Sequence, residues 1–164
     1  MIRPVLRLPE RVLKKRAEDV AGGDVQSLVD DLIETMRASP ACVGLAAPQV
    51  GVLQRVIVVD VTGHPKTKTC HGLVALVDPS IVDSSGKDSG REGCMSVPDL
   101  TANVTRSKRV AVSGTLPDGS RAVIVTDGFE ARAFQHEIDH LDGMLILDRV
   151  ASLATDVFRR QTYK

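Results

Sequence analysis

Apolar residues recur at helical spacing in the segment that follows Asp24. The recurring positions are Val25, Leu28, Val29, Leu32, Ile33 and Met36. Steps of three and four residues place these side chains on one face of an α-helix. Asp24 is a suitable N-terminal cap for this helix. We expect the helix to end near Ser39, because Pro40 disfavours helical backbone in the residue before it.

The middle of the chain favours extended structure. The valine-rich run "RVIVVDV" (55–61) is typical of a strand. The small apolar stretch "VGLAAPQVG" (43–51) and the run "LVALVDPSIV" (73–82) are also predicted to be extended. "HPKTKTCHG" (64–72) predicts a loop, and "DSSGKDSG" (83–90) predicts a turn-rich connection.

A hairpin and a second helix are predicted next. Apolar and polar residues alternate from Val104 to Val125, with Asp118-Gly119 at a position that suits the turn of a hairpin. Asp127, with Glu130 three residues later, resembles a capping box. A helix is therefore expected over residues 128–141, with Gly143 ending it.

The last part of the chain predicts a short strand at 144–148 and a final helix at 150–160. The resulting order is helix, strands, helix, short strand, helix, which indicates an α+β fold rather than regular βαβ alternation. At 164 residues, the chain is expected to form a single domain, 1–164.

Composition narrows the function classes. Hydrophobic residues make up 43 % and aromatic residues only 2 %, so the core must consist mainly of Val, Leu, Ile and Ala. Lys+Arg and Asp+Glu balance at 21 each, which argues against a sequence-specific nucleic-acid partner and gives no reason to expect binding to a membrane. We expect no signal peptide and no membrane span. Three widely spaced cysteines favour a reducing, cytoplasmic location over a disulfide framework.

The segment "HEIDH" contains the strongest chemical signal. His136 and His140 are four residues apart and therefore share one helical face, where both imidazoles can bind one metal ion. Glu137 follows the first histidine, and in this motif the glutamate acts on a metal-bound water. A catalytic metal usually has three protein ligands and one open position. The sequence therefore predicts a third ligand elsewhere in the chain.

The spacing alone leaves the third ligand open. No histidine or glutamate follows His140, and the later acidic residues are Asp142, Asp148 and Asp156. Upstream, Cys70 and His71 lie in a segment expected to be an ordinary exposed loop. Cys94, in "REGCMSVP", is equally consistent with a metal ligand and with a small buried residue.

Three segments together resemble the motifs of the peptide deformylase family, in the order typical of that family. They are "GLAAPQ" (44–49), "EGCMS" (92–96) and "HEIDH" (136–140). The similarity covers most of the chain, including "DPSIV", "QHEIDHLDG" and the closing "FRRQTYK". Length and the lack of large insertions resemble the compact bacterial type. The resemblance implies an α+β catalytic domain in which antiparallel or mixed β-sheets surround a central metal-binding helix.

The resemblance also implies an activity. Members hydrolyse the N-formyl group of the N-terminal formylmethionine of newly made polypeptides and release formate, with a metal-bound water as nucleophile. It assigns the metal ligands to Cys94, His136 and His140, and general acid/base catalysis to Glu137. One divalent ion is expected per chain, Fe²⁺ natively, with Zn²⁺, Ni²⁺ or Co²⁺ as alternatives. N-formylmethionyl peptides are the implied substrates, and transient contact with the ribosome is compatible with this role.

The remaining site residues also follow from the resemblance. Gln49 and the backbone N–H of Met95 face the developing oxyanion, and Gly44 lets the substrate backbone approach closely. Glu92 and Arg106 match a structural ion pair that braces the second motif. The implied substrate-binding set is Val43, Gly44, Leu45, Met95, Thr101, Phe129 and Ala133.

Three positions depart from the family pattern. Cys42 replaces a glycine, and we expect it to pack as a small buried residue. Met95 replaces a common leucine with little change in volume. Thr101 replaces an arginine found near the substrate backbone in many bacterial members, and a threonine lacks that charge and fork of donors.

Two competing functions are retained. One is a non-catalytic or altered-substrate deformylase paralogue, which Cys42 and Thr101 would suit. The other is a zinc peptidase that uses the H-E-x-x-H motif alone, in which Cys94 would have no role.

Overall fold

A computed structural model describes residues 1–160, so residues 161–164, which end the closing "FRRQTYK" segment, lie outside it. The described chain contains two α-helices, three short 3₁₀ helices and eight strands. The helices are α1 (Gln26–Arg37), α2 (Gly128–Leu141), η1 (Arg11–Lys14), η2 (Ala47–Val50) and η3 (Ile146–Asp148). The strands are β1 (Gly44–Ala46), β2 (Val56–Val59), β3 (Val74–Ser85), β4 (Asp88–Cys94), β5 (Val97–Arg106), β6 (Arg109–Thr115), β7 (Arg121–Asp127) and β8 (Val157–Arg159).

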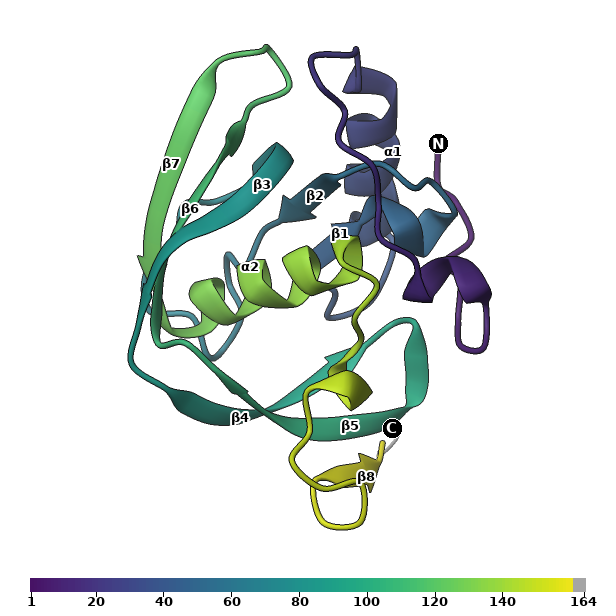
Figure 1. Cartoon of the computed structure of the whole chain (residues 1–164), viewed down its shortest axis with the longest axis vertical. Helices are drawn as coiled ribbons and strands as arrows, with labels where there is room; N and C mark the ends of the chain where they lie inside the picture. Colours follow the sequence, from purple (N-terminus) through teal and green to yellow (C-terminus); the bar gives the residue numbers. More distant parts are fainter. Residues whose placement is uncertain (161–164) are drawn as a thin grey trace.

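The strands form two sheets, and α2 lies between them (Figure 1). The larger sheet has the order β1-β2-β3-β6-β7, and the smaller sheet has the order β4-β5-β8. All pairings between these strands are antiparallel. The predicted α+β class, with sheets around a central helix, is therefore confirmed.

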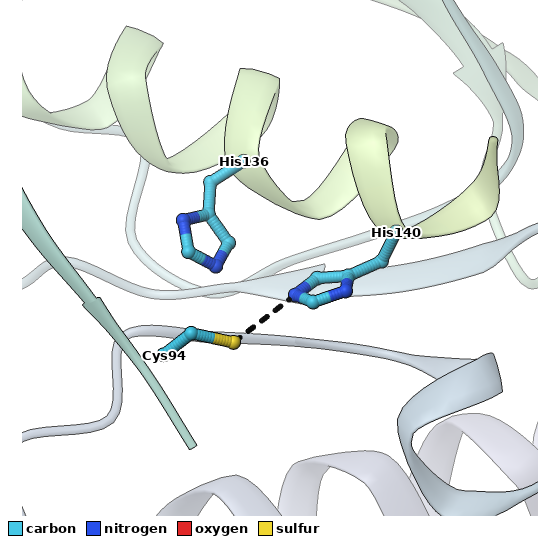
Figure 2. Close-up of side chains that lie close together, drawn as sticks. All are labelled: Cys94, His136 and His140. Carbon is cyan, nitrogen blue, oxygen red and sulfur yellow. Dashed lines mark hydrogen bonds between the residues drawn. The ribbon is translucent and has the colours of Figure 1, made fainter. Parts of the chain in front are cut away.

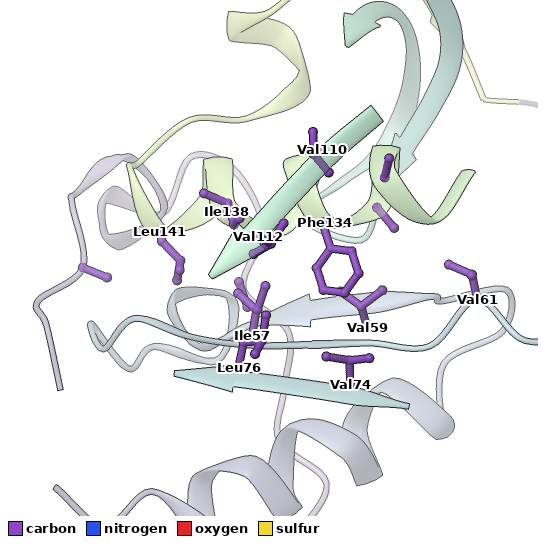
Figure 3. Close-up of a cluster of buried hydrophobic side chains, with 14 residues drawn as sticks. Ile57, Val59, Val61, Val74, Leu76, Val110, Val112, Phe134, Ile138 and Leu141 are labelled. Atoms are coloured by element: carbon purple, nitrogen blue, oxygen red, sulfur yellow. The ribbon is translucent and has the colours of Figure 1, made fainter. Parts of the chain in front are cut away.

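Strand β2 of the larger sheet is buried on both of its faces. Ile57 and Val59 face α2, where they pack in one apolar cluster with Phe134 (Figure 3). Val56 and Val58, on the opposite face, pack in a second cluster that includes the apolar side of α1. Successive strand residues point to opposite faces, so a run of four valine and isoleucine residues fills two cores at once. This packing gives α2 a rigid support on one side.

The predicted helices and hairpin agree largely with the structure. Helix α2 spans the predicted residues, and Gly143 follows it with a φ of +74°. Asp118-Gly119 lies in the turn between β6 and β7. At α1 the N-cap is Val25, and Asp24 acts from one residue earlier by accepting a hydrogen bond from the Gln26 N–H at 3.0 Å.

The predicted connection at 83–90 is wrong in extent. Strand β3 continues to Ser85 and β4 begins at Asp88, so only Gly86 and Lys87 separate these two strands. The polar residues of this segment are held in strands by their partners, because Ser85 pairs with Arg109 and Asp88 pairs with Arg106. Local composition does not reveal such pairing.

The predicted C-terminal elements are also wrong. Residues 146–148 form a 3₁₀ helix instead of a strand. In place of a helix over 150–160, the chain turns and then forms β8, which pairs with β5 through Phe158 and Thr101. The Asp156 carboxylate accepts a hydrogen bond from the Ser152 N–H at 3.0 Å, and such a local side-chain bond competes with helix formation.

Helix α2 lacks the predicted capping box. Asp127 occupies the N-cap position without a side-chain capping bond. Glu130 instead accepts hydrogen bonds from the Thr126 hydroxyl at 2.7 Å and from the His71 N–H at 2.7 Å.

Within residues 1–160, neither α-helix combines the length and the apolarity that crossing a membrane requires.

Candidate active site

Helix α2 carries two kinds of side chain on two faces. Phe134, Ile138 and Leu141 follow helical spacing and pack toward the larger sheet. His136 and His140 project from another face toward β4 of the smaller sheet (Figure 2). The apolar face thus anchors the helix in the core, and this anchoring fixes the direction of both imidazoles.

Cys94 meets these histidines from the end of β4. The β4–β5 pairing shifts register between Gly93 and Cys94. The Cys94 Sγ lies 3.4 Å from the His140 Nε2 (Figure 2). Ligand atoms of Cys94, His136 and His140 all lie within 4.8 Å of one another. This spacing is close to what one ion bound about 2.0–2.3 Å from each ligand requires.

The Cys94 thiol is poised to ionise. Burial favours the neutral thiol, but the nearby His140 charge and the hydrogen bonds with His136 and His140 outweigh burial, so the pKa of Cys94 lies well below its usual value. The thiolate is the form of cysteine that binds metals. The chemistry of the donor set therefore fits a divalent metal.

Glu92 holds His136 in place. Its Oε1 lies 2.9 Å from the His136 Nδ1. Arg106 donates two hydrogen bonds of 2.9 Å to the Glu92 carboxylate, and the Arg132 Nη1 donates a third at 2.6 Å. Burial alone would raise the pKa of Glu92, yet the hydrogen bonds with His136 and Arg106, together with their charges, keep that pKa far below its ordinary value. A carboxylate of this kind fixes the orientation of a ligating histidine.

Glu137 has the opposite environment. Its side chain is buried, and its Oε1 has no hydrogen-bond partner within the described chain. Burial raises the pKa of Glu137, whereas the charges of His136 and His140 oppose that rise. A Cβ placed on Gly44 would lie 2.6 Å from the Glu137 Oε2, so only glycine leaves this carboxylate room. The Glu137 Oε1 thus has unused hydrogen-bonding capacity at a buried position.

The Gln49 side chain is fixed at both ends of its amide. The Oε1 accepts a hydrogen bond from the Ala46 N–H at 3.0 Å, and the Nε2 donates to the Ser96 Oγ at 3.1 Å. The Nε2 also lies 3.7 Å from the Cys94 Sγ. The amide donor of Gln49 is therefore held beside the Cys94 sulfur.

Met95 is the residue directly after Cys94. Cys94 pairs with Val97, which leaves Met95 and Ser96 as the two turn residues between β4 and β5. The Met95 N–H donates no hydrogen bond within residues 1–160.

The implied substrate residues occupy different surroundings. Val43 and Phe129 are partly buried at the edge of the cluster that packs against α2, and Ala133 is buried within it. Thr101 is half-buried on β5, opposite Gly93. The Leu45 side chain is fully buried in the cluster around α1, because alternation along β1 turns it away from α2.

Two cysteines lie outside the metal-binding group. The Cys42 thiol donates to the Gly44 carbonyl at 3.1 Å and packs against the cluster around α1. Burial, reinforced by the Glu137 charge, raises the pKa of Cys42 to about 12. Cys70 lies 3.6 Å from the Thr62 hydroxyl, and neighbouring His71 binds Glu130.

The sequence reasoning missed two supporting residues. Ser96 receives the Gln49 amide and stands inside the motif that contains Cys94. Arg132 lies one helical turn before His136, so helical spacing alone offered a signal for it.

Comparison with known proteins agrees with this geometry. The family model for polypeptide deformylase matches residues 2–156. The peptide deformylase of Thermodesulfovibrio yellowstonii is 43 % identical over 159 residues, which cover 96 % of this chain and 94 % of that protein. The peptide deformylase of Halothermothrix orenii is also 43 % identical, over 94 % of this chain and 99 % of that protein.

Solved structures give the same result. A crystal structure of a peptide deformylase from Legionella pneumophila matches with a TM-score of 0.83 and 37 % identity, over 93 % of this chain and 88 % of that one. A class I type b peptide deformylase from Acinetobacter baumannii with Met-Ala-Ser bound matches with a TM-score of 0.84 and 35 % identity, over 91 % of this chain and 99 % of that one. The chain therefore belongs to the peptide deformylase family, hydrolases that remove N-formyl groups from nascent peptides.

Proposed function

We propose that this protein hydrolyses the formamide of N-terminal formylmethionine and releases formate, with Glu137 as the general acid/base. The observation that supports this most directly is the placement of an unpartnered, buried Glu137 oxygen beside the group of Cys94, His136 and His140. Formamide hydrolysis needs a nucleophile stronger than neutral water and a group that transfers a proton, and this arrangement has residues for both.

Cys94, His136 and His140 would hold one divalent metal ion. When bound, such an ion lowers the pKa of a coordinated water from about 15.7 to near 7. We propose Fe²⁺ as the native ion, with Zn²⁺, Ni²⁺ or Co²⁺ able to replace it. A Cys/His₂ donor set is compatible with iron and with zinc.

The proton would be moved by Glu137. Its free Oε1 can accept a proton from water, and the same carboxyl can later deliver it to the leaving amine. Burial raises the pKa of Glu137, so it is a stronger base than an exposed glutamate. Gly44 leaves room for the other carboxylate oxygen, because a Cβ at that position would lie 2.6 Å from the Glu137 Oε2.

Attack on the formyl carbon places negative charge on the former carbonyl oxygen. Gln49 and the backbone N–H of Met95 would donate hydrogen bonds to that oxygen. The Gln49 amide is preorganised for this role by Ala46 and Ser96, which fix its orientation before the substrate arrives.

The peptide would bind as an additional strand. Strand β1 ends the larger sheet and β4 ends the smaller sheet, so each has one edge without a neighbouring strand in its own sheet. Both edges lead to the site, through Gly44 and Cys94. Edge strands bind extended peptides through the main chain, which suits an enzyme that acts on many different N-termini. We also propose a cytoplasmic location and transient contact with the ribosome, where such N-termini emerge.

Formate release from formyl-Met-Ala-Ser tests this function. The protein is loaded anaerobically with Fe²⁺, and wild type is compared with Glu137→Ala and with the control Glu18→Ala, which changes an exposed glutamate. We expect formate from wild type and the control, and none from Glu137→Ala at equal metal content. Silence in all three with metal bound would favour the non-catalytic paralogue, and cleavage of internal peptide bonds would favour a zinc peptidase.

The identity of the metal needs a separate experiment. A thiolate ligand beside redox-active iron is vulnerable to oxidation. We expect the Fe²⁺ enzyme to lose activity in air and the Ni²⁺ or Zn²⁺ forms to resist that loss. Stable activity in air at full iron occupancy would contradict this expectation.

A further inference from the structure

Gly93 leaves a gap beside the metal-binding group, and an arginine side chain fills it. Gly93 is exposed on β4 and directly precedes Cys94. A Cβ built on Gly93 would overlap the Arg160 Nη2 and lie 3.3 Å from the Arg160 Cζ. The same Nη2 lies 3.5 Å from the Cys94 carbonyl oxygen. The guanidinium of Arg160 therefore lies one residue from a proposed metal ligand.

Strand β8 brings Arg160 to this position from the far end of the chain. Phe158 pairs with Thr101, and the Arg160 N–H donates to the Asp99 carbonyl at 2.9 Å. The Arg91 guanidinium stacks on the Phe158 ring at 3.6 Å and so links β8 to β4. The backbone at Arg160 is thus held by β5, and its side chain extends across β5 to β4.

Most donors of the Arg160 side chain have no partner among residues 1–160. A guanidinium has five N–H donors. Within residues 1–160, its side chain makes a single hydrogen bond, the long contact to the Cys94 carbonyl, and takes part in no ion pair. By contrast, Arg106 and Arg132 near the same site donate to carboxylates. A half-buried cation at the end of an edge strand, with donors that no residue of the described part uses, is suited to bind an acceptor that arrives with a ligand.

We propose that Arg160 binds the main chain of the substrate beyond formylmethionine, by donating to a peptide carbonyl oxygen. This inference rests on the proposed function. A peptide that adds to the edge of β4 passes Gly93 as it leaves Cys94, and carbonyl oxygens are the acceptors that every peptide sequence presents there. Thr101, on the same face, contributes only a methyl group near Gly93.

The KM for formyl-Met-Ala-Ser-amide tests this role. We expect Arg160→Ala to raise KM by roughly ten- to a hundredfold, as for loss of a charged hydrogen bond, with kcat unchanged. The matched control Arg159→Ala removes a neighbouring arginine that is exposed on β8, and its KM should not change. An unchanged KM in Arg160→Ala would overturn the proposal. The amidated peptide excludes a contact with a terminal carboxylate, and a KM effect seen only with the free acid would also overturn it.

Two further substrates and variants separate binding from a structural role. Formyl-methionine amide has no second residue, so wild type and Arg160→Ala should have the same KM for it. The double variant Thr101→Arg/Arg160→Ala should recover the wild-type KM, because residue 101 is paired with Gly93 and its longer side chain reaches the same gap. Failure of this rescue, with both variants folded, would contradict the proposal. If Arg160→Ala does not fold, Arg160→Lys replaces it and should raise KM by a smaller factor.

Measurement of product binding tests the role of Arg160 separately from the proposed deformylase activity. Calorimetry measures the Kd of Met-Ala-Ser-amide without turnover, and Arg160→Ala should weaken it by the factor seen in KM. If wild type releases no formate but binds the product through Arg160, the proposed function fails and the binding role stands. If wild type is active and the Kd does not depend on Arg160, the proposed function stands and the binding role of Arg160 fails.

Discussion

Glu92 and Glu137 are both buried beside His136, with 7 % and 4 % of their surfaces exposed, yet their surroundings differ. Glu92 accepts hydrogen bonds from two arginines and has a strongly lowered pKa. Glu137 has an oxygen without a partner and a raised pKa. Two glutamates in one site thus differ in pKa because their surroundings differ. A carboxylate that accepts several hydrogen bonds suits a positioning role, and a buried carboxylate oxygen without a partner suits proton transfer.

The fold explains how these surroundings arise. Arg106 extends from β5 and Arg132 from the preceding turn of α2, so both cations converge on Glu92. Arg106 also pairs with Asp139, which Arg149 binds in turn. No cation forms an ion pair with Glu137 within residues 1–160, and Gly44 gives it space where another residue would have a side chain. The two glutamates therefore differ because arginine donors surround Glu92, whereas Glu137 has no such donors among the described residues and lies beside the space that Gly44 leaves.

Removal of the metal should produce the largest loss of activity. It should abolish the chemistry in which Glu137 takes part and leave the ion pairs of Glu92 intact. Because the ion acidifies the attacking water, a chelated protein should release no formate, and anaerobic addition of Fe²⁺ should restore release. The Glu92 ion pairs need no metal, so the near-UV circular dichroism of the apoprotein should still indicate a folded state. Formate release with no detectable metal would contradict the proposed chemistry.

Glu137→Gln should lower kcat by about 10²–10⁴, the usual contribution of general acid/base catalysis. It should not lower Tm, since the variant removes a buried carboxyl whose Oε1 has no partner to lose. Thermal unfolding and formate release on the same preparation test both parts. A large drop in Tm would show that Glu137 stabilises the fold, as Glu92 does, and would contradict the contrast between the two residues.

Glu92→Gln should reverse that pattern. It removes the Glu92 charge from two buried arginines, of which Arg106 keeps its ion pair with Asp139, and loss of one member of a buried ion pair costs about 3–5 kcal/mol of unfolding free energy. Because the pKa of Glu92 is lowered on folding, its stabilisation is complete above the ordinary value of 4.5 and is lost as the pH falls below it. Denaturant unfolding should therefore show a wide gap from wild type at pH 7 and a narrower gap at acidic pH. Asp88→Asn, which alters an exposed residue near Arg132, serves as the control and should change little.

Gln49→Ala should have the smallest of these effects on free energy. Loss of one oxyanion donor typically costs about 2.7–4 kcal/mol of the activation barrier, or 10²–10³ in kcat. KM should change less than kcat, because the hydrogen bond forms mainly in the transition state. Gln54→Ala, at an exposed position, provides the matched control. Equal losses in both variants would exclude a specific role for Gln49.

Local signals in the sequence were sufficient for α2 and for the β6–β7 hairpin. Helical spacing and Gly143 predicted the helix bounds, and Asp118-Gly119 predicted the turn. The same signals failed at the end of the chain, because β8 exists only where Thr101 of β5 offers it a partner. A distant strand of this kind leaves no trace in the spacing of nearby residues.

The candidate site divides in a similar way. His136, Glu137 and His140 could be recognised from helical spacing, because they lie within five consecutive residues of one helix. Cys94 could not be chosen by spacing, and the resemblance to a family supplied it. The resemblance also placed Leu45 in the substrate set, and the structure adds that alternation along β1 buries its side chain against α1. Arg160 was missed because its proximity to Gly93 depends on β8.

The short connection at Gly86 and Lys87, where the chain passes from the larger sheet to the smaller one, affects how the two layers are held together. The proposed ligands come from both sides of that connection, since Cys94 belongs to the smaller sheet and both histidines belong to the helix packed on the larger one. A bound ion would act as a cross-link between two layers that the chain joins covalently at only a few points. An ion that binds only the folded protein also raises its resistance to unfolding. Loss of the ion would then weaken the joint between the layers at the same moment that it stops catalysis.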